Sequence, residues 1–148
     1  MQQVFLCGQT GSINRGCEAI VRSTVKLLNR RGGDIHLVTF APNQDNIVVR
    51  NLGINMIEYA KYPSTIYRYV CAGFRKILCM PTVGQGFIQK PLFSRLRKDD
   101  ICLNIGGDTY CYGTPIVSMA LNKFNYRKNI TSILWCCSIE KESMKGQV

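Results

Sequence analysis

The chain has 148 residues, of which 46% are hydrophobic, and its formal net charge is +10. This length and composition suit one globular domain with its own core and exclude a disordered chain. No stretch approaches the roughly 18 consecutive apolar residues that span a membrane, and no basic flank precedes the first apolar run, so we expect a protein that is neither secreted nor membrane-spanning. A cytoplasmic environment would keep the eight cysteines reduced, and we expect four of them to be buried: Cys7, Cys102, Cys136 and Cys137.

The stretch from Val4 to Ile20 predicts a strand, a glycine-punctuated turn and the start of a helix. Unpaired backbone N–H groups at such a helix start favour an anionic or hydroxyl-rich ligand. Two phosphate-binding motifs are excluded. A Walker loop needs Lys and then Ser or Thr where Cys17 and Glu18 follow Gly16, and the GxGxxG dinucleotide fingerprint is absent. A tight turn without a ligand is an equal alternative.

The next elements alternate between helix and strand. An amphipathic helix is predicted over Cys17–Arg31, a strand over Ile35–Phe40, a short helix or loop at the polar residues 42–46, and a strand over Ile54–Tyr59. Strands joined by helical crossovers predict an α/β fold with a Rossmann-like, mostly parallel sheet and flanking helices. In such a sheet, ligands bind beyond the carboxyl ends of the strands.

The segment from Lys61 to Lys98 is basic, because it contains eight Lys and Arg residues and no acidic residue. Its first part has the spacing of an amphipathic helix, and the favoured interpretation is a solvated surface helix over the sheet. The alternatives are peripheral contact with an anionic membrane and, least favoured, binding of nucleic acid, for which no recognised RNA-binding signature is present. Pro81–Pro91 is predicted to be a mobile loop.

A second turn follows the predicted strand Asp100–Ile105, at Gly106, Gly107 and Asp108. Two glycines at the end of a strand let backbone N–H groups face a crevice, and Asp108 could accept a hydrogen bond from a sugar hydroxyl. An ordinary turn with an Asx-type hydrogen bond is the alternative. A helix over Ile116–Phe124 and a strand over Ile130–Cys137 are then expected.

Metal and histidine chemistry have little support in the sequence. No CxxC pair is present, and the single histidine, His36, lies within a strand pattern, so no zinc site is predicted. A lone histidine in a strand is more often a structural residue with a satisfied hydrogen bond than a catalytic base.

Three motifs resemble the polysaccharide pyruvyl transferase family: NRGCEAI (Asn14–Ile20), IGGDTYCYG (Ile105–Gly113) and LWCCSIE (Leu134–Glu140). They occur in the family's order and span nearly the whole chain. The family has Asn-x-Gly followed by an acidic or small residue at the first motif, and a strand ending in two or three glycines at the second. Asp108 stands where a third glycine is common, which favours contact by a side chain over close approach of the backbone.

The resemblance implies the amino-terminal, Rossmann-like half of a GT-B-type two-domain transferase. Residues 1–148 would be one domain, without its carboxyl-terminal partner, and we expect little or no turnover from this half alone. The implied reaction transfers a pyruvyl group from phosphoenolpyruvate, the donor substrate, to two hydroxyls of a sugar or lipid-linked oligosaccharide in cell-surface polysaccharide biosynthesis. No cofactor or metal is implied, and the protein would be cytoplasmic, with peripheral contact with the inner face of the membrane through Lys61 to Lys98 as the alternative noted above.

The motifs also imply the substrate-binding residues but leave the catalytic residues unassigned. The predicted substrate-binding residues are Asn14, Arg15, Gly16, Glu18, Gly106, Gly107 and Asp108. Two other functions fit the sequence: the corresponding half of a glycosyltransferase that uses a nucleotide sugar, and a non-catalytic basic module that binds an anionic surface.

Overall fold

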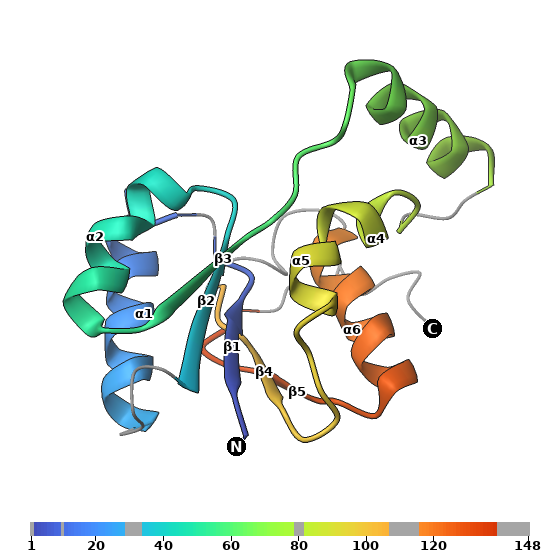
Figure 1. The fold of residues 1–148 in the computed structure, drawn as a ribbon. Coiled ribbons are helices and arrows are strands. Elements are labelled where there is room, and N and C mark those ends of the chain that lie inside the picture. The colour runs from blue at the N-terminus through green and yellow to red at the C-terminus, as the bar shows by residue number, and fades with distance from the viewer. Residues whose placement is uncertain (1, 10, 29–33, 79–81, 107–115, 139–148) are drawn as a thin grey trace.

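A computed structural model describes residues 2–9, 11–28, 34–78, 82–106 and 116–138. These residues form an α/β fold around a five-stranded sheet whose order is β3-β2-β1-β4-β5, and every pair of neighbouring strands is parallel. The predicted Rossmann-like α/β class is thus confirmed, with the sheet parallel throughout (Figure 1). The strands are β1 (Val4–Cys7), β2 (Ile35–Thr39), β3 (Asn55–Glu58), β4 (Ile101–Asn104) and β5 (Thr131–Leu134).

Two apolar layers hold helices against opposite faces of the sheet. Helices α1 (Arg15–Leu28) and α2 (Pro42–Leu52) cover one face, where Leu6 and Leu37 are fully buried. Helices α4 (Gln85–Ile88), α5 (Lys90–Phe93) and α6 (Ile116–Lys128) cover the other. Successive residues of each central strand point alternately into the two layers. Because both layers are apolar, these strands appear in the sequence as continuous apolar runs.

Cys7 and Cys102 lie in the second layer and are buried, as predicted. The neighbouring thiol of Cys102, together with burial, raises the pKa of the Cys7 thiol well above its ordinary value. Both residues therefore act as small apolar groups of the core.

Two segments are more helical than the sequence predicted. The polar residues 42–46 begin a full helix, α2, which has 11 residues, starts at Pro42 and ends at Gly53 in the left-handed conformation (φ 62°). Pro81–Pro91 was predicted to be a loop, but its described residues include α4 and the start of α5. That prediction was wrong because Ile88 is buried against the sheet, and this tertiary packing outweighs the local preference of the glycines.

Helix α3 (Thr65–Ile77) forms where the sequence predicted a helix, but it does not lie over the sheet. Figure 1 shows it projecting away from the domain beyond α4. Cys71 is the one residue of α3 that is buried. The favoured interpretation of this segment was a solvated surface helix over the sheet. The exposure of α3 agrees with it, but the predicted position over the sheet was wrong.

The last described strand, β5, is an edge strand whose four residues are all exposed. Cys136 is exposed and Cys137 half-buried, so the prediction that both are buried was wrong. An apolar run at a sheet edge lacks the second neighbouring strand that would enclose it. Trp135 links this edge to α1, because its Nε1 donates a hydrogen bond of 3.1 Å to Thr24 Oγ1.

Within the described residues, no helix has both the length and the apolar character needed to cross a membrane.

Candidate functional site

The direction of chain progression reverses between β1 and β4. From β1 the chain moves outward to β2 and β3, and then returns to β4 on the other side of β1. Cys7 is aligned with Asn104 at the carboxyl ends of these two strands, and the Ile105 N–H donates a hydrogen bond of 2.8 Å to the Cys7 carbonyl. The turns after β1 and β4 therefore start side by side on one rim, which is the place where parallel α/β sheets bind ligands.

The turn after β1 is held by a buried carboxylate, that of Asp45 in the first turn of α2. Asp45 accepts hydrogen bonds from Gln9 Nε2 (2.7 Å) and the Ser12 N–H (2.8 Å), and also from the hydroxyls of Ser12 and Thr39. It thus joins the ends of β1 and β2 to the start of α2. Such a network fixes the backbone of the turn before any ligand arrives.

The backbone conformation of Gly11 explains why a glycine occupies this position of the turn. Its φ of 120° lies in a region that side chains with a Cβ rarely adopt, and a Cβ at this position would lie 2.6 Å from Gln44 Oε1. The tight-turn interpretation therefore holds for Gly11. Gly16 differs, because a Cβ there would meet only Asn14 Oδ1, at 3.1 Å.

The predicted residues of the first motif lie at the start of α1. Asn14 caps the helix: its Oδ1 accepts a hydrogen bond of 2.9 Å from the Gly16 N–H, and its carbonyl accepts one of 3.1 Å from the Glu18 N–H. Glu18 Oε1 forms an ion pair with Arg22 Nε at 2.7 Å. Arg15 and Gly16 are exposed on the surface.

Of the second motif, Gly106 is buried at the end of β4, whereas Gly107 and Asp108 lie outside the described residues. Among the residues that the structure describes, no hydrogen bond or ion pair joins Gly106 to Asn14, Arg15, Gly16 or Glu18. The structure therefore places the two motifs on one rim without linking them directly.

Two buried amides at this rim each retain a carbonyl oxygen without a protein partner in the described structure. Asn104 donates to Asn122 Oδ1 and Ser132 Oγ, both at 3.3 Å, while its own Oδ1 accepts nothing. Gln9 donates to Asp45, and its Oε1 likewise has no donor. A buried acceptor without a partner is costly, and amide oxygens are suited to accept hydrogen bonds from hydroxyl groups.

Sequence reasoning missed Gln9, Thr39, Asp45 and Asn104. The available signal was their position, since Gln9 and Asn104 lie at or just beyond the ends of apolar strand runs. For Asp45 the signal was weaker, because an acidic residue in the first turn of a helix is usually solvated and stabilised by the helix dipole alone.

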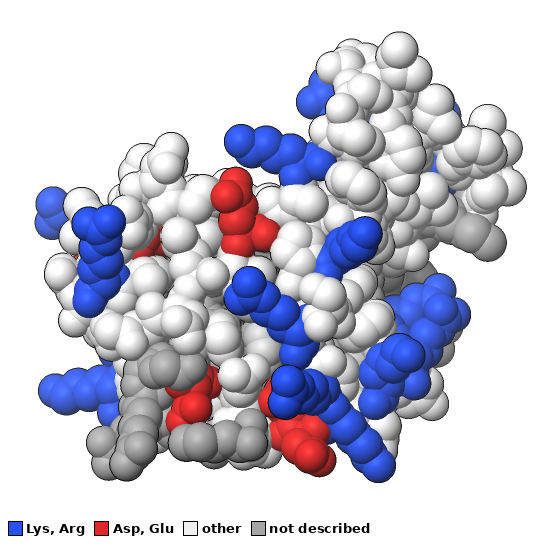
Figure 2. Space-filling model, in the orientation of Figure 1, with Lys and Arg blue, Asp and Glu red and all other residues white. Residues whose placement is uncertain are grey.

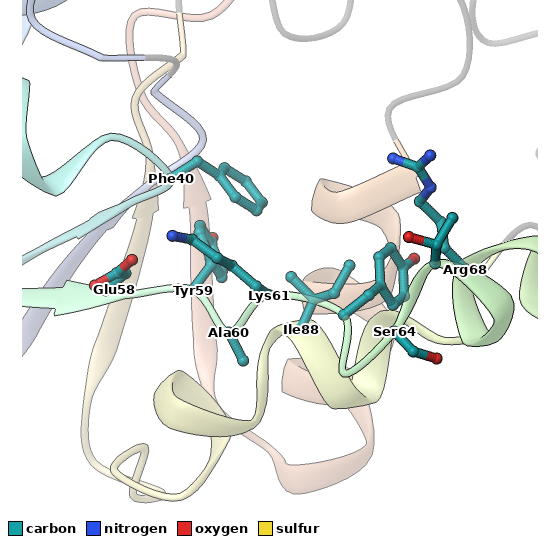
Figure 3. A pocket seen from close by; sticks show the side chains of 10 residues that line it. Phe40, Glu58, Tyr59, Ala60, Lys61, Ser64, Arg68 and Ile88 are labelled. Carbon is teal, nitrogen blue, oxygen red and sulfur yellow. The ribbon is translucent and has the colours of Figure 1, made fainter.

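A cavity of about 390 Å³ lies on the same rim, beyond β2 and β3. Its wall includes a stacked aromatic pair, Phe40 and Tyr59, whose ring centroids are 4.1 Å apart. Figure 3 shows Phe40 and Lys61 on the strand side and Arg68 of α3 on the other. The cavity wall carries the two cations and the amino-terminal end of α3, which attract an anionic group, but also the carboxylate of Glu58, which repels one. The aromatic pair suits an apolar or planar group.

His36 lies at the opposite end of the sheet, where it pairs in register with Phe5 and stacks on its ring at 4.8 Å. Burial and the nearby Arg95 lower the pKa of His36. Its position in a strand is confirmed, but the expected hydrogen bond is absent, because neither ring nitrogen has a partner in the described structure. In the same residues, no group of three or more His, Cys, Asp or Glu side chains could hold a metal ion.

Comparison of the chain with models of protein families, with characterised proteins and with solved structures gives no match. The fold and the rim define a Rossmann-like α/β domain with a candidate ligand site at the point where the strand order reverses. The resemblance to polysaccharide pyruvyl transferases stays a prediction that depends on the three sequence motifs.

Proposed function

We propose that residues 1–148 form the acceptor-binding half of a transferase that adds pyruvyl groups from phosphoenolpyruvate to sugar hydroxyls. The observation that carries the proposal is the meeting of the turns after β1 and β4 on one rim. The first motif that resembles the pyruvyl transferase family, with Asn14 and Gly16, begins α1 directly after the turn that follows β1, and the second motif, with Gly106, directly follows β4.

The chemistry of the rim supports a polyol as the ligand. Gln9 Oε1 and Asn104 Oδ1 are buried acceptors without a donor among the described residues, and sugar hydroxyls are donors. The network around Asp45 keeps the neighbouring turn in one conformation, which reduces the entropy lost when a weakly interacting sugar binds.

The proposal assigns only the acceptor side to this chain. Pyruvyl transfer also needs an acid that protonates the methylene carbon of the donor, and cations that stabilise the departing phosphate. We assign neither role to a residue of the described rim.

The test is calorimetric titration of the chain with methyl hexosides, with phosphoenolpyruvate and with a nucleotide sugar. We expect hexoside binding that Gly16→Leu weakens, because the new side chain would project from the start of α1 at the rim. Gly73→Leu is the matched control, since Gly73 is also helical and exposed and a Cβ there meets nothing within 4 Å.

The alternative is a glycosyltransferase half, and the same fold and rim favour it. This alternative would be favoured if the chain bound the nucleotide sugar but not the hexosides, and if Gly16→Leu abolished that binding. Absence of binding in all three titrations would contradict both functions.

A further inference from the structure

Helix α3 is a complete helix with little attachment to the rest of the domain. It has 13 residues, and it begins at Ser64, whose Oγ accepts a hydrogen bond of 3.1 Å from the Tyr67 N–H. Its last turn carries Arg75 and Lys76, whose positive charges interact favourably with the negative carboxyl end of the helix dipole. The helix therefore has its own terminal stabilisation.

The contact between α3 and the body is narrow. Cys71 packs on Gly84, where a Cβ would lie only 2.9 Å from Cys71 Sγ. The Tyr67 ring lies between Tyr62 and Phe87, with 5.9 Å between its ring centroid and each of theirs. The side of α3 that faces the domain is therefore occupied.

A different side of α3 exposes apolar residues. Ile66 and Ile77 are 76% and 78% exposed, and Val70 and Phe74 about half. The spacing of these residues places them in one stripe along the helix. Scattered exposed apolar residues are ordinary, but a contiguous stripe indicates an interaction surface.

All charged residues of α3 itself are positive, and the carboxylate that shares a cavity with Arg68 is that of Glu58 in β3. Lys61, Arg68, Arg75 and Lys76 lie in or next to α3, and no acidic residue occurs between Glu58 and Asp99. Figure 2 shows the surface over α3, at the upper right, as mainly uncharged, with Lys and Arg side chains around it. By helical spacing, Lys76 is the cation of α3 nearest to the stripe, whereas Arg68 and Arg75 project from the opposite side of the helix.

The basic residues of the segment Lys61–Lys98 lie in two different places in the structure. Arg97 lies in the turn before β4, where its N–H donates to Asp100 Oδ2, and Arg95 is close enough to His36 in β2 to lower its pKa. These residues are at the amino ends of the strands, opposite the rim from which the chain leads into α3. Of the eight cations in this segment, Lys61, Arg68, Arg75 and Lys76 are those that lie in α3 or in the chain leading into it.

We propose that α3 docks on an anionic membrane surface. The stripe of Ile66, Val70, Phe74 and Ile77 lies among the lipid headgroups, the positive charge of α3 attracts the anionic surface, and Lys76 is the cation nearest to the lipid phosphates. A helix that has an apolar stripe and carries only positive charges is complementary to an anionic bilayer. The proposal is independent of the sugar site, because it uses none of the residues at the ends of β1 and β4.

The test is co-sedimentation of residues 1–148 with vesicles of phosphatidylcholine alone or mixed with phosphatidylglycerol. We expect binding to the mixed vesicles that weakens as salt is raised. The double variant Ile66→Ser/Ile77→Ser should lose it. Ile47→Ser is the matched control, since Ile47 is an isoleucine that is 68% exposed on a different helix, α2, and should leave binding unchanged.

Two single variants, each of which removes one positive charge, test the electrostatic contribution without altering the apolar stripe. Lys76→Gln should weaken binding about fivefold, whereas Lys128→Gln should not, although each lysine lies in the last turn of a 13-residue helix. Circular dichroism confirms that every variant is folded.

Three outcomes would overturn the proposal. They are absence of binding to mixed vesicles, equal binding to both vesicle types at all salt concentrations, and a wild-type dimer in solution that Ile66→Ser/Ile77→Ser converts to a monomer. The last result would assign the stripe to a second copy of the chain.

Discussion

The turn after β1 and helix α3 both follow carboxyl ends of strands, yet they are held in opposite ways. The turn is fixed by hydrogen bonds to the buried carboxylate of Asp45, whereas α3 contacts the body mainly through Cys71 and Tyr67 and exposes its apolar stripe. Buried polar groups specify one geometry, and exposed apolar groups leave a surface free for a partner. The rim thus combines a rigid candidate binding site with a loosely attached helix.

The largest expected effect comes from Asp45→Ala, which leaves the buried donors of Gln9, Ser12 and Thr39 without their acceptor. We expect the free energy of unfolding to fall by about 3–5 kcal/mol in urea denaturation. Asp99→Ala is the control, because Asp99 is exposed. A loss below about 1 kcal/mol for Asp45→Ala would mean that the carboxylate does not hold the turn.

A smaller and local effect is expected from Gly84→Ala. Gly84 has a φ of 82°, and the new Cβ would lie 2.9 Å from Cys71 Sγ, so α3 should detach more easily. We expect backbone amides of α3 to exchange about tenfold faster in hydrogen exchange, while those of α1 change little. Gly86→Ala, where a Cβ meets nothing within 4 Å, should leave both rates nearly unchanged. Equal acceleration in α1 and α3 would show that α3 unfolds together with the core.

Asn14→Ala removes the cap of α1 and should lower the free energy of unfolding by about 1 kcal/mol. Asn14→Ser, which keeps a capping oxygen, should retain most of the stability. If hexoside binding is lost in Asn14→Ala but kept in Asn14→Ser, the role of Asn14 is to cap the helix; loss in both variants would indicate direct contact with the ligand.

The smallest effect concerns His36, at the end of the sheet away from the rim. Its pKa is lowered by burial and by Arg95, against the raising influence of Asp100 and Asp34, so the unfolded chain binds a proton more readily than the folded one. The free energy of unfolding should therefore fall as the pH decreases from about 6.5 through the folded-state pKa.

His36→Phe should remove this component of the pH dependence while keeping a ring against Phe5. The measurement is urea denaturation of both proteins between about pH 7 and pH 5. Parallel stability curves for the two proteins would contradict the account of His36.

Local sequence patterns predicted the strands of the sheet and helices α1 and α3, because continuous apolar runs and helical spacing are local signals. The start of α2 was underestimated because its first residues are polar, and α4 because its glycines suggested a loop. The exposure of Cys136 could not be predicted, since an apolar run does not indicate whether its strand lies at a sheet edge.

The candidate site was predicted in position but not in detail. Alternation of strands and helices was enough to place the turns after β1 and β4 on one rim. The sequence did not reveal Asp45 or Asn104, because their burial depends on the packing of α2 and α6. The amphipathic spacing in the sequence likewise identified the apolar side of α3, but it did not indicate whether that side packs on the sheet or is exposed.

The most direct test of the rim as the ligand site is the mapping of amide chemical-shift changes in the labelled chain during titration with a methyl hexoside. The account predicts changes at Gly8, Gly11, Ile105 and Gly106, on the carboxyl rim, and none at Asp34 and Asp100, on the amino side. Changes concentrated at Asp34 and Asp100, or confined to α3, would contradict it.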